Sequence, residues 1–300
     1  MASQRDVKNR IDSVKNIRKI TRAMEMVAAA RLRRAEQRIA HLRPYAGAIR
    51  RMTRQAAEAA GGEVGQLPIL QQHESEQTIA ILLVTADRGL AGAFNSQILR
   101  AGLRTASEYE SDGRDVAFYA SGRRGVSSLS FRGREVAGSY TGFTERPAYA
   151  DARDIAADLM AAYVDGKVDR VDILYNGYVS PLVQEVRRET LLPLQEATIL
   201  ETPEGEDDGE DTGHHALVEY EPGPEEILER LIPDYVEISL YRALLESTAS
   251  ELGARMTAMR NASQNAAEVI DDLTLEMNRA RQAEITQEIM EVVAGAEALV

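Results

Sequence analysis

Helical periodicity dominates both ends of the chain, and shorter segments of another kind lie between them. From Ala2 to Arg43 there is no Gly and no Pro, and good helix formers such as Ala, Arg, Met and Glu predominate. After Pro233 no Pro occurs, and Gly253 is the only Gly between Asp234 and Ala294. A helix of about 60 residues would be roughly 90 Å long. Both ends therefore predict helices much longer than the globular average.

Each predicted helix has an apolar seam with steps of four and three residues. The C-terminal seam consists of Leu245, Ala249, Leu252, Met256, Met259, Ser263, Ala266, Ile270, Leu273, Met277 and Ala280. The N-terminal seam consists of Val7, Ile11, Val14, Thr21, Ala28, Leu32, Ala35, Ile39 and Leu42. Arg18 and Glu25 interrupt the N-terminal seam, and a second stripe (Ile17, Ile20, Met24, Val27) predicts that the seam shifts around the helix there.

So long a periodic helix needs a partner along its length. We expect residues 1–60 and 225–300 to pair as an antiparallel coiled coil. A homodimeric coiled coil is the alternative, although Leu and Ile are sparse at the positions where a stable dimer would need them.

The middle of the chain has the pattern of an α/β domain. Strands are predicted at Thr78–Thr85, Val116–Ala120, Glu135–Tyr140 and Val171–Tyr175, with a further edge strand near Val183–Leu192. Helices are predicted at Gly92–Tyr109, Arg124–Phe131 and Tyr149–Tyr163. This alternation indicates a Rossmann-like domain with a mostly parallel sheet over residues 77–200. Residues 61–76 form the preceding linker, and residues 201–224 form an acidic, mobile segment.

The net charge of −13 conceals a division along the chain. Residues 1–60 carry a net charge of +10, and residues 61–300 carry −23. There is no Cys, which excludes disulfides, cysteine nucleophiles and thiolate metal sites. No apolar run approaches the roughly 20 residues of a membrane span, and no secretory signal is evident. We expect a soluble, non-secreted protein with no direct membrane span.

Candidate chemistry is sparse. The stretch TADRGLAGAFN, Thr85–Asn95, follows the first strand and could hold an anion at a helix start, but neither GxGxxG nor a P-loop occurs. A structural turn stabilised by Asp87 and Arg88 is the preferred interpretation. The pair His214–His215 and the pair Asp271–Asp272 favour a solvated loop and a solvated helix face over a metal or catalytic site. We therefore expect no catalytic residue, no cofactor and no metal.

The basic N-terminal helix leaves open two kinds of partner. Its arginines could bind nucleic acid, or the chain could be a coiled-coil scaffold. The charges surround the helix instead of lining one face, so an acidic protein surface accounts for them equally well.

Four strings carry a resemblance to a known family. They are KNRIDSVKNIRKITRAMEMVAAARLRRA (Lys8–Ala35), TADRGLAGAFN, YRALLESTASELGARMTAMRNASQNA (Tyr241–Ala266) and NRARQAEITQEIMEVVAGAEAL (Asn278–Leu299). In this order they resemble the gamma subunit of the F-type ATP synthase over essentially the whole chain. Two departures stand out: Ala91 occupies a position where the family usually has Cys, and the acidic segment around Glu204–His215 is unusual.

The resemblance implies a central rotor shaft without catalytic residues, and therefore no nucleic-acid partner. Its partners would be the alpha and beta subunits of the head, the epsilon subunit and the membrane c-ring. Rotation of the c-ring, driven by protons, would turn the shaft and cycle the three catalytic beta subunits, which make ATP from ADP and phosphate. The protein would then be peripheral to the cell membrane, on its cytoplasmic side.

The resemblance also implies contact residues. Those expected to face a beta subunit are Met24, Arg33, Arg34, Arg255, Arg281, Gln282 and Thr286. Those expected to form a shaft tip in an apolar bearing are Ile285, Ile289, Met290, Val292 and Val293. We expect Arg281 and Gln282 to engage one beta subunit at a time, and the basic shaft to match carboxylates on the surrounding ring.

Overall fold

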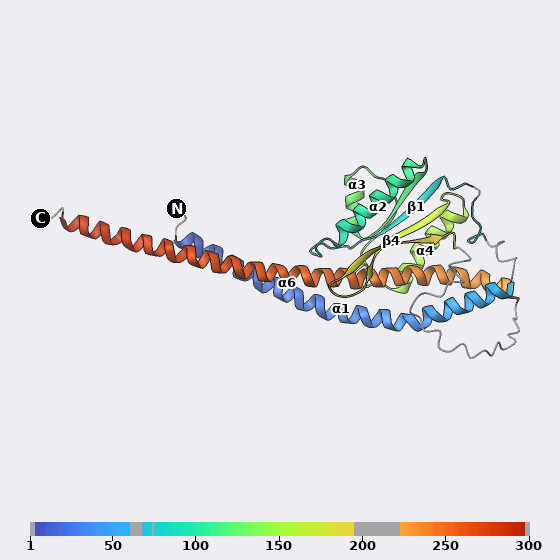
Figure 1. Cartoon of the computed structure of the whole chain (residues 1–300), viewed down its shortest axis with the longest axis horizontal. Coiled ribbons are helices and arrows are strands. Elements are labelled where there is room, and N and C mark those ends of the chain that lie inside the picture. Colours follow the sequence, from blue (N-terminus) through green and yellow to red (C-terminus); the bar gives the residue numbers. More distant parts are fainter. Residues whose placement is uncertain (1–3, 61–67, 74, 195–222, 298–300) are drawn as a thin grey trace. The chain divides into compact units, whose positions relative to one another are not determined.

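The computed structural model describes residues 4–60, 68–73, 75–194 and 223–297. The chain forms two compact units (Figure 1). One, the paired-helix unit, contains Met1–Ala30 and Arg255–Val300; the other, the α/β unit, contains Arg31–Ala254. Helices α1 (Gln4–Ala60) and α6 (Pro224–Glu297) each contribute to both units.

A five-stranded sheet forms the centre of the α/β unit. Its strands are β1 (Thr78–Val84), β2 (Asp115–Ser121), β3 (Val136–Tyr140), β4 (Arg170–Tyr178) and β5 (Gln184–Leu192). They lie in the order β3-β2-β1-β4-β5, and every neighbouring pair is parallel except β4 and β5. The mostly parallel sheet and its predicted edge strand are confirmed.

Helices cover both faces of this sheet, as Figure 1 shows. Helices α2 (Phe94–Ser111) and α3 (Arg123–Phe131) pack on one face, where Ile81 and Leu83 of β1 point. Helix α4 (Tyr149–Val164) and the first part of α6 pack on the other face, where Leu82 and Val84 point. Because β1 is buried from both sides, its sequence is a continuous apolar run without alternation.

Helix α6 begins at Pro224, within one residue of the start expected for the C-terminal helix of residues 225–300. It continues through Pro233, which lies inside the helix. A Pro inside a helix removes one backbone hydrogen bond and crowds the preceding turn. Burial of Leu228 and Ile232, at 0% and 1% exposure, offsets that cost, because both pack in a cluster with Ile49 of α1.

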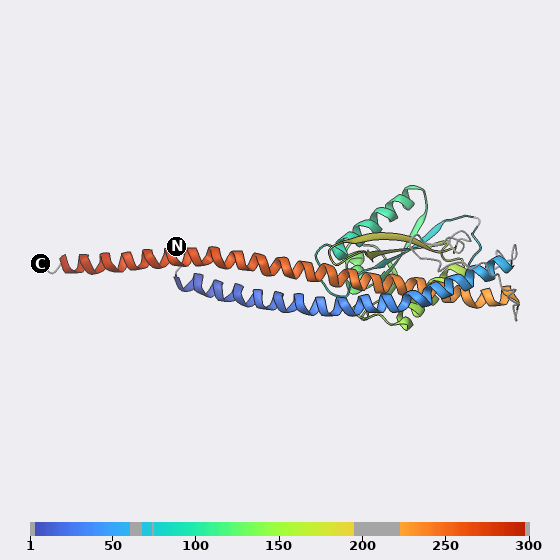
Figure 2. The same cartoon turned by 60° about the horizontal axis from the view of Figure 1, so that its bottom comes forward.

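In the paired-helix unit, α1 and α6 run antiparallel side by side (Figure 2). Val7 and Ile11 of α1 form one buried cluster with Ile270 and Leu273 of α6. All described members of the C-terminal seam are buried or half-buried. The antiparallel pairing predicted from the two seams is therefore confirmed here within a single chain.

The predicted shift of the α1 seam is wrong. Ile17, Ile20 and Val27 of the second stripe are 53%, 59% and 52% exposed, whereas Thr21 and Ala28 of the first seam are buried. The first seam therefore continues past Glu25 on the same face of the helix, although Arg18 within it is exposed. The charged residue at seam position 25 is accommodated because Glu25 Oε1 accepts a hydrogen bond from Arg260 Nε of α6 at 2.9 Å.

Two further expectations concern segments that the structure leaves largely undescribed. Residues 201–222 of the acidic segment, which include Glu204–His215, lie outside the described residues. The same holds for residues 61–67 and residue 74 of the linker. Among the helices that are described, none has a stretch long and apolar enough to cross a membrane.

Candidate functional site

The last part of α6 extends beyond its partner helix. Met277 is the last α6 residue packed against the cluster that contains Val7 of α1, and every described side chain from Arg281 to Ala294 is exposed. The residues expected to form the tip lie in this stretch: Ile285, Ile289, Met290, Val292 and Val293, with exposed fractions of 46%, 57%, 64%, 72% and 49%. The paired-helix unit thus ends in a single helix with exposed apolar side chains.

Polar residues lie at the start of this apolar end on the same helix. Arg281, Gln282 and Thr286 are all exposed. The Thr286 hydroxyl donates to the Gln282 carbonyl oxygen at 2.9 Å, which occupies it within the helix. Among the described residues, the side chains of Arg281 and Gln282 have no hydrogen-bond or ionic partner and can reach outward.

The structure does not bring the other expected contact residues together with this end. Met24 is half-buried in α1 of the paired-helix unit, and Arg33 and Arg34 are exposed on α1 in the α/β unit. Arg255 is only 8% exposed, so little of its surface is accessible to a partner. The expected residues therefore form separate groups along the two helices.

The turn after β1 is held by Asp87. Its Oδ1 accepts from the Arg123 amide at 3.1 Å, and its Oδ2 accepts from the Gly142 amide and the Thr144 hydroxyl, both at 2.9 Å. Burial alone would raise the pKa of Asp87, but these hydrogen bonds to the carboxylate outweigh it and lower the pKa below its ordinary value. Asp87 therefore ties the turn to two other loops in its charged form.

The backbone of this turn also lies close to its neighbours. Gly122 has φ +92°, and a Cβ there would lie 2.3 Å from the Thr85 carbonyl oxygen. The Thr85 hydroxyl donates to the Ser121 carbonyl oxygen at 2.7 Å and accepts from the Gly125 amide at 2.9 Å. The amides of Ala86 and Asp87 are likewise bonded, to Asn95 Oδ1 and to the Thr144 hydroxyl. These internal bonds support the structural interpretation of the turn over an anion site.

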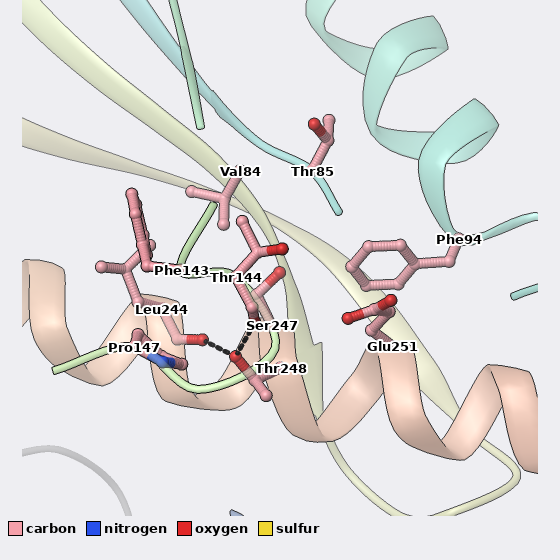
Figure 3. A pocket seen from close by; sticks show the side chains of 10 residues that line it. All are labelled: Val84, Thr85, Phe94, Phe143, Thr144, Pro147, Leu244, Ser247, Thr248 and Glu251. Atoms are coloured by element: carbon pink, nitrogen blue, oxygen red, sulfur yellow. Dashed lines mark hydrogen bonds between the residues drawn. The ribbon is translucent and has the colours of Figure 1, made fainter. Parts of the chain in front are cut away.

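A very small cavity lies beside the turn (Figure 3). Its volume of about 10 Å³ is the space of about one water molecule. Side chains of the turn, α6 and the loop before α4 line it, and the Thr248 hydroxyl there donates to the Thr144 and Leu244 carbonyl oxygens. This space is too small for a nucleotide, whereas a separate open hollow of about 860 Å³ is lined by Gly89, Gly92 and Asn95 of the turn and by residues of α2 and α3. No group of three or more His, Asp or Glu residues placed to hold a metal ion occurs among the described residues.

A basic groove lies on α1 of the α/β unit. Glu145, in the loop before α4, accepts from Arg31 Nη1 at 2.7 Å and lies 2.9 Å from Arg88 Nε. Next to this cluster a cavity of about 580 Å³ is lined by Arg34, Arg38, His41 and Arg146, among others. Sequence reasoning missed Glu145 and Thr144, since no pattern in the chain links them to residues so far away in sequence.

Fold and site together define a class. It is an α/β protein with a long antiparallel helical coiled coil, and it comprises a helix pair with an exposed apolar end and an α/β unit with a mostly parallel sheet. Internal hydrogen bonds close the turn after β1.

Comparisons with known proteins agree with this class. The family model described as ATP synthase matches residues 3–299. An ATP synthase gamma chain from Rubrobacter xylanophilus is 45% identical over 300 residues, covering 100% of this chain and 99% of that one. The gamma chain from Moorella thermoacetica is 43% identical over 299 residues, with 100% of both chains covered. The chain therefore belongs to the ATP synthase gamma chain family.

Solved structures give the same result. The chain matches a central stalk and c-ring structure of the Tetrahymena thermophila mitochondrial ATP synthase with a TM-score of 0.60 and 26% identity, covering 81% of this chain and 99% of that chain. It also matches the Euglena gracilis mitochondrial ATP synthase with a TM-score of 0.65 and 18% identity, covering 99% and 94%. The second match supports the fold alone.

Proposed function

We propose that this chain is the central rotor shaft of a proton-translocating F-type ATP synthase. It transmits torque to the catalytic subunits and does not catalyse a reaction itself. The observation that carries the proposal is the helix pair, in which α6 extends past α1 and ends in exposed apolar residues. A shaft that turns inside a ring needs such an end, because apolar side chains make contacts without directional hydrogen bonds. The family membership and the central-stalk match support the same role.

In this proposal, the alpha and beta subunits surround the helix pair, and the α/β unit meets the epsilon subunit and the c-ring. Rotation of the c-ring turns the shaft and drives the three beta subunits through different states, so that they form ATP from ADP and phosphate. The protein is then peripheral to the cell membrane on the cytoplasmic side. The scaffold and nucleic-acid alternatives are not favoured, since neither accounts for full-length identity to gamma chains.

In this proposal, residues along the two helices supply the contacts. Met24 and Arg255 belong to the shaft beside a beta subunit, Arg281, Gln282 and Thr286 contact a beta loop, and the tip residues run in an apolar bearing. Arg33 and Arg34 match carboxylates of the surrounding subunits. Arg31 differs from them, because its guanidinium already binds Glu145 of this chain.

Assembly tests the proposal directly. The chain is expressed with the alpha, beta and epsilon subunits of the same organism, and the purified complex is assayed for ATP hydrolysis. We expect the four chains to co-purify and to release from membranes together in low salt. A free chain that binds DNA, or a homodimer that ignores alpha and beta, would contradict the proposal.

The arginines can be tested in the same complex. Arg33→Glu with Arg34→Glu should weaken assembly or lower ATP hydrolysis, since two repulsive charges would then face acidic partners. Arg31 is left unchanged, because Glu at that position would also repel Glu145 and obscure the result. Unchanged assembly and activity would contradict the charge match.

A further inference from the structure

Four charged side chains connect strand β5 to helix α6 in the α/β unit. Arg242 Nη2 of α6 donates to Glu189 Oε2 of β5 at 2.7 Å, and Arg187 Nη1 of β5 donates to Glu246 Oε2 of α6 at 3.1 Å. Arg242 Nη1 also lies 3.8 Å from Glu246 Oε1. We call these four residues the β5–α6 charge network. Strand β5 and helix α6 each contribute one cation and one anion. The Arg242–Glu189 and Arg187–Glu246 pairs both join the strand to the helix.

The network continues into the core of the sheet. Tyr175 of β4 has an exposed fraction of 0%, and its hydroxyl donates to Glu189 Oε1 at 2.6 Å. The Glu246 side chain is 13% exposed. Burial raises the pKa of Glu246 above its ordinary value, while Arg242 and Arg187 oppose that rise. Placing charges here is costly, so their partners must be well placed.

The neighbouring strand leaves room for one member of the network. A Cβ at Gly177 of β4 would lie 2.4 Å from Arg187 Nε, 2.6 Å from its Cδ and 2.7 Å from its Cζ. Any other residue at Gly177 would therefore displace the Arg187 side chain. The position of this arginine is fixed by the backbone of the sheet as well as by Glu246.

We propose that the β5–α6 charge network fixes the rotational setting of α6 about its own axis, so that torque passes between α6 and the sheet without slip. This inference rests on the proposed rotor function. Leu240 and Leu244 of α6 also pack on the sheet, but apolar contact is non-directional and resists turning weakly. Ion pairs with arginine have a fixed geometry, and these hold two successive turns of α6 to one strand.

Two other polar contacts of α6 in the α/β unit are single neutral hydrogen bonds. The Ser250 hydroxyl donates to the Asn176 carbonyl oxygen of β4 at 3.0 Å, and the Thr248 hydroxyl donates to the Thr144 carbonyl oxygen at 3.0 Å. A neutral hydrogen bond is roughly half as strong as one between charged groups. The charge network is therefore the strongest directional contact described between α6 and the sheet.

The first experiment uses the isolated full chain. Since the chain has no native Cys, nitroxide labels can be placed by Glu185→Cys on β5 and Glu229→Cys on α6, both exposed. The network variant combines Arg187→Met, Glu189→Gln, Arg242→Met and Glu246→Gln, which leaves no unpaired buried charge. The control, Arg104→Met, removes an ion pair on α2 whose side chains are 81% and 53% exposed, and it leaves Glu108 paired with Arg188 of β5.

Pulsed electron paramagnetic resonance then gives the distance distribution between the labels. We expect the network variant to widen it at least about twofold, and the control to leave it unchanged. A native distribution in the network variant would overturn the proposal. Should that variant fail to fold, Glu246→Gln alone removes one charge but keeps a hydrogen-bonding side chain, and its distribution decides in the same way.

The second experiment uses the assembled complex in lipid vesicles, where proton uptake is measured per ATP hydrolysed. We expect the network variant to hydrolyse ATP while this ratio falls at least about twofold; the control should keep the native ratio. A native ratio in the network variant would overturn the proposal. A native chain that does not assemble would instead contradict the rotor function, while the label distances would still report on the network.

Discussion

Three hydrogen bonds join Asp87 and Thr144, which are 57 positions apart in the chain. The Thr144 hydroxyl donates to Asp87 Oδ2 at 2.9 Å, and the Asp87 amide donates back to the same hydroxyl at 2.9 Å. The turn after β1 is thereby joined to the loop before α4. Through Glu145, the same loop also binds Arg31 of α1. The Gly-containing turn after β1, which could have been an anion-binding loop, thus connects the sheet to the loop that binds α1.

Asp87→Asn should destabilise the chain at neutral pH by about 1–3 kcal/mol, because buried donors lose a charged acceptor. The pKa of Asp87 is lowered on folding, so its contribution is complete above about pH 4, its unfolded range. That contribution is lost as the pH falls through the lower folded pKa. Urea unfolding of both proteins at pH 7 and pH 3 checks this. A difference that does not shrink in acid would contradict the assignment.

Gly122→Ala should destabilise the chain by about 1–3 kcal/mol. The residue has a positive φ, and a Cβ would collide with the Thr85 carbonyl oxygen. Gly133→Ala is the matched control, since Gly133 has φ +70° with no atom within 4 Å of an added Cβ. Unfolding measurements should therefore show a smaller loss for Gly133→Ala. Equal losses of unfolding free energy in the two variants would contradict this prediction, because the collision with Thr85 would then add nothing to the cost of a positive φ.

The helix pair can be tested with two leucines on one turn of α6. Leu273 is 6% exposed in the cluster with Val7 and Ile11, whereas Leu275 is 59% exposed. Leu273→Ala should cost about 2–3 kcal/mol through lost burial and a cavity, and Leu275→Ala about 0.5 kcal/mol or less. Hydrogen exchange of the α1 amides reports the pairing. Equal effects of the two substitutions would contradict the antiparallel seam.

Much of this fold is predictable from local patterns. The apolar run at β1 and the seam of α6 both depend on period, and burial follows that period from Leu245 to Met277. The continuation of α6 through Pro233 is not predictable from a local pattern, because Leu228 and Ile232 beside this Pro pack against Ile49, which is far away in the chain.

The contact residues show the same limit. The stripe through Ile17 and Ile20 has helical spacing, yet it is exposed, because one partner helix can cover only one face of α1. Glu25 seemed to break the seam but pairs with Arg260, 235 residues away. No local rule distinguishes such a charge from a solvated one. The resemblance named Arg255 as a contact, and only the structure reveals that it is buried.

The exposed polar residues near the α6 end lead to a functional prediction. Arg281→Ala with Gln282→Ala should lower coupled ATP synthesis, since both side chains lack a partner among the described residues and are proposed to bind a beta loop. Losing two such hydrogen bonds corresponds to roughly 1–3 kcal/mol. The matched control is Asn278→Ala with Arg279→Ala, which removes an amide and a guanidinium one turn earlier and should leave coupled ATP synthesis unchanged. Synthesis at the native rate in the first variant would sink the proposed contact.

Rotation itself is the most direct test of the proposed role. The head complex is fixed to a surface through its beta subunits, and a bead is attached to the α/β unit at Phe131→Cys, a position that is 89% exposed in a chain without native Cys. With ATP, the bead should turn in one direction, and the turning should stop when ATP is removed. A head that hydrolyses ATP at its full rate with this chain bound, while the bead stays still, would contradict the central claim.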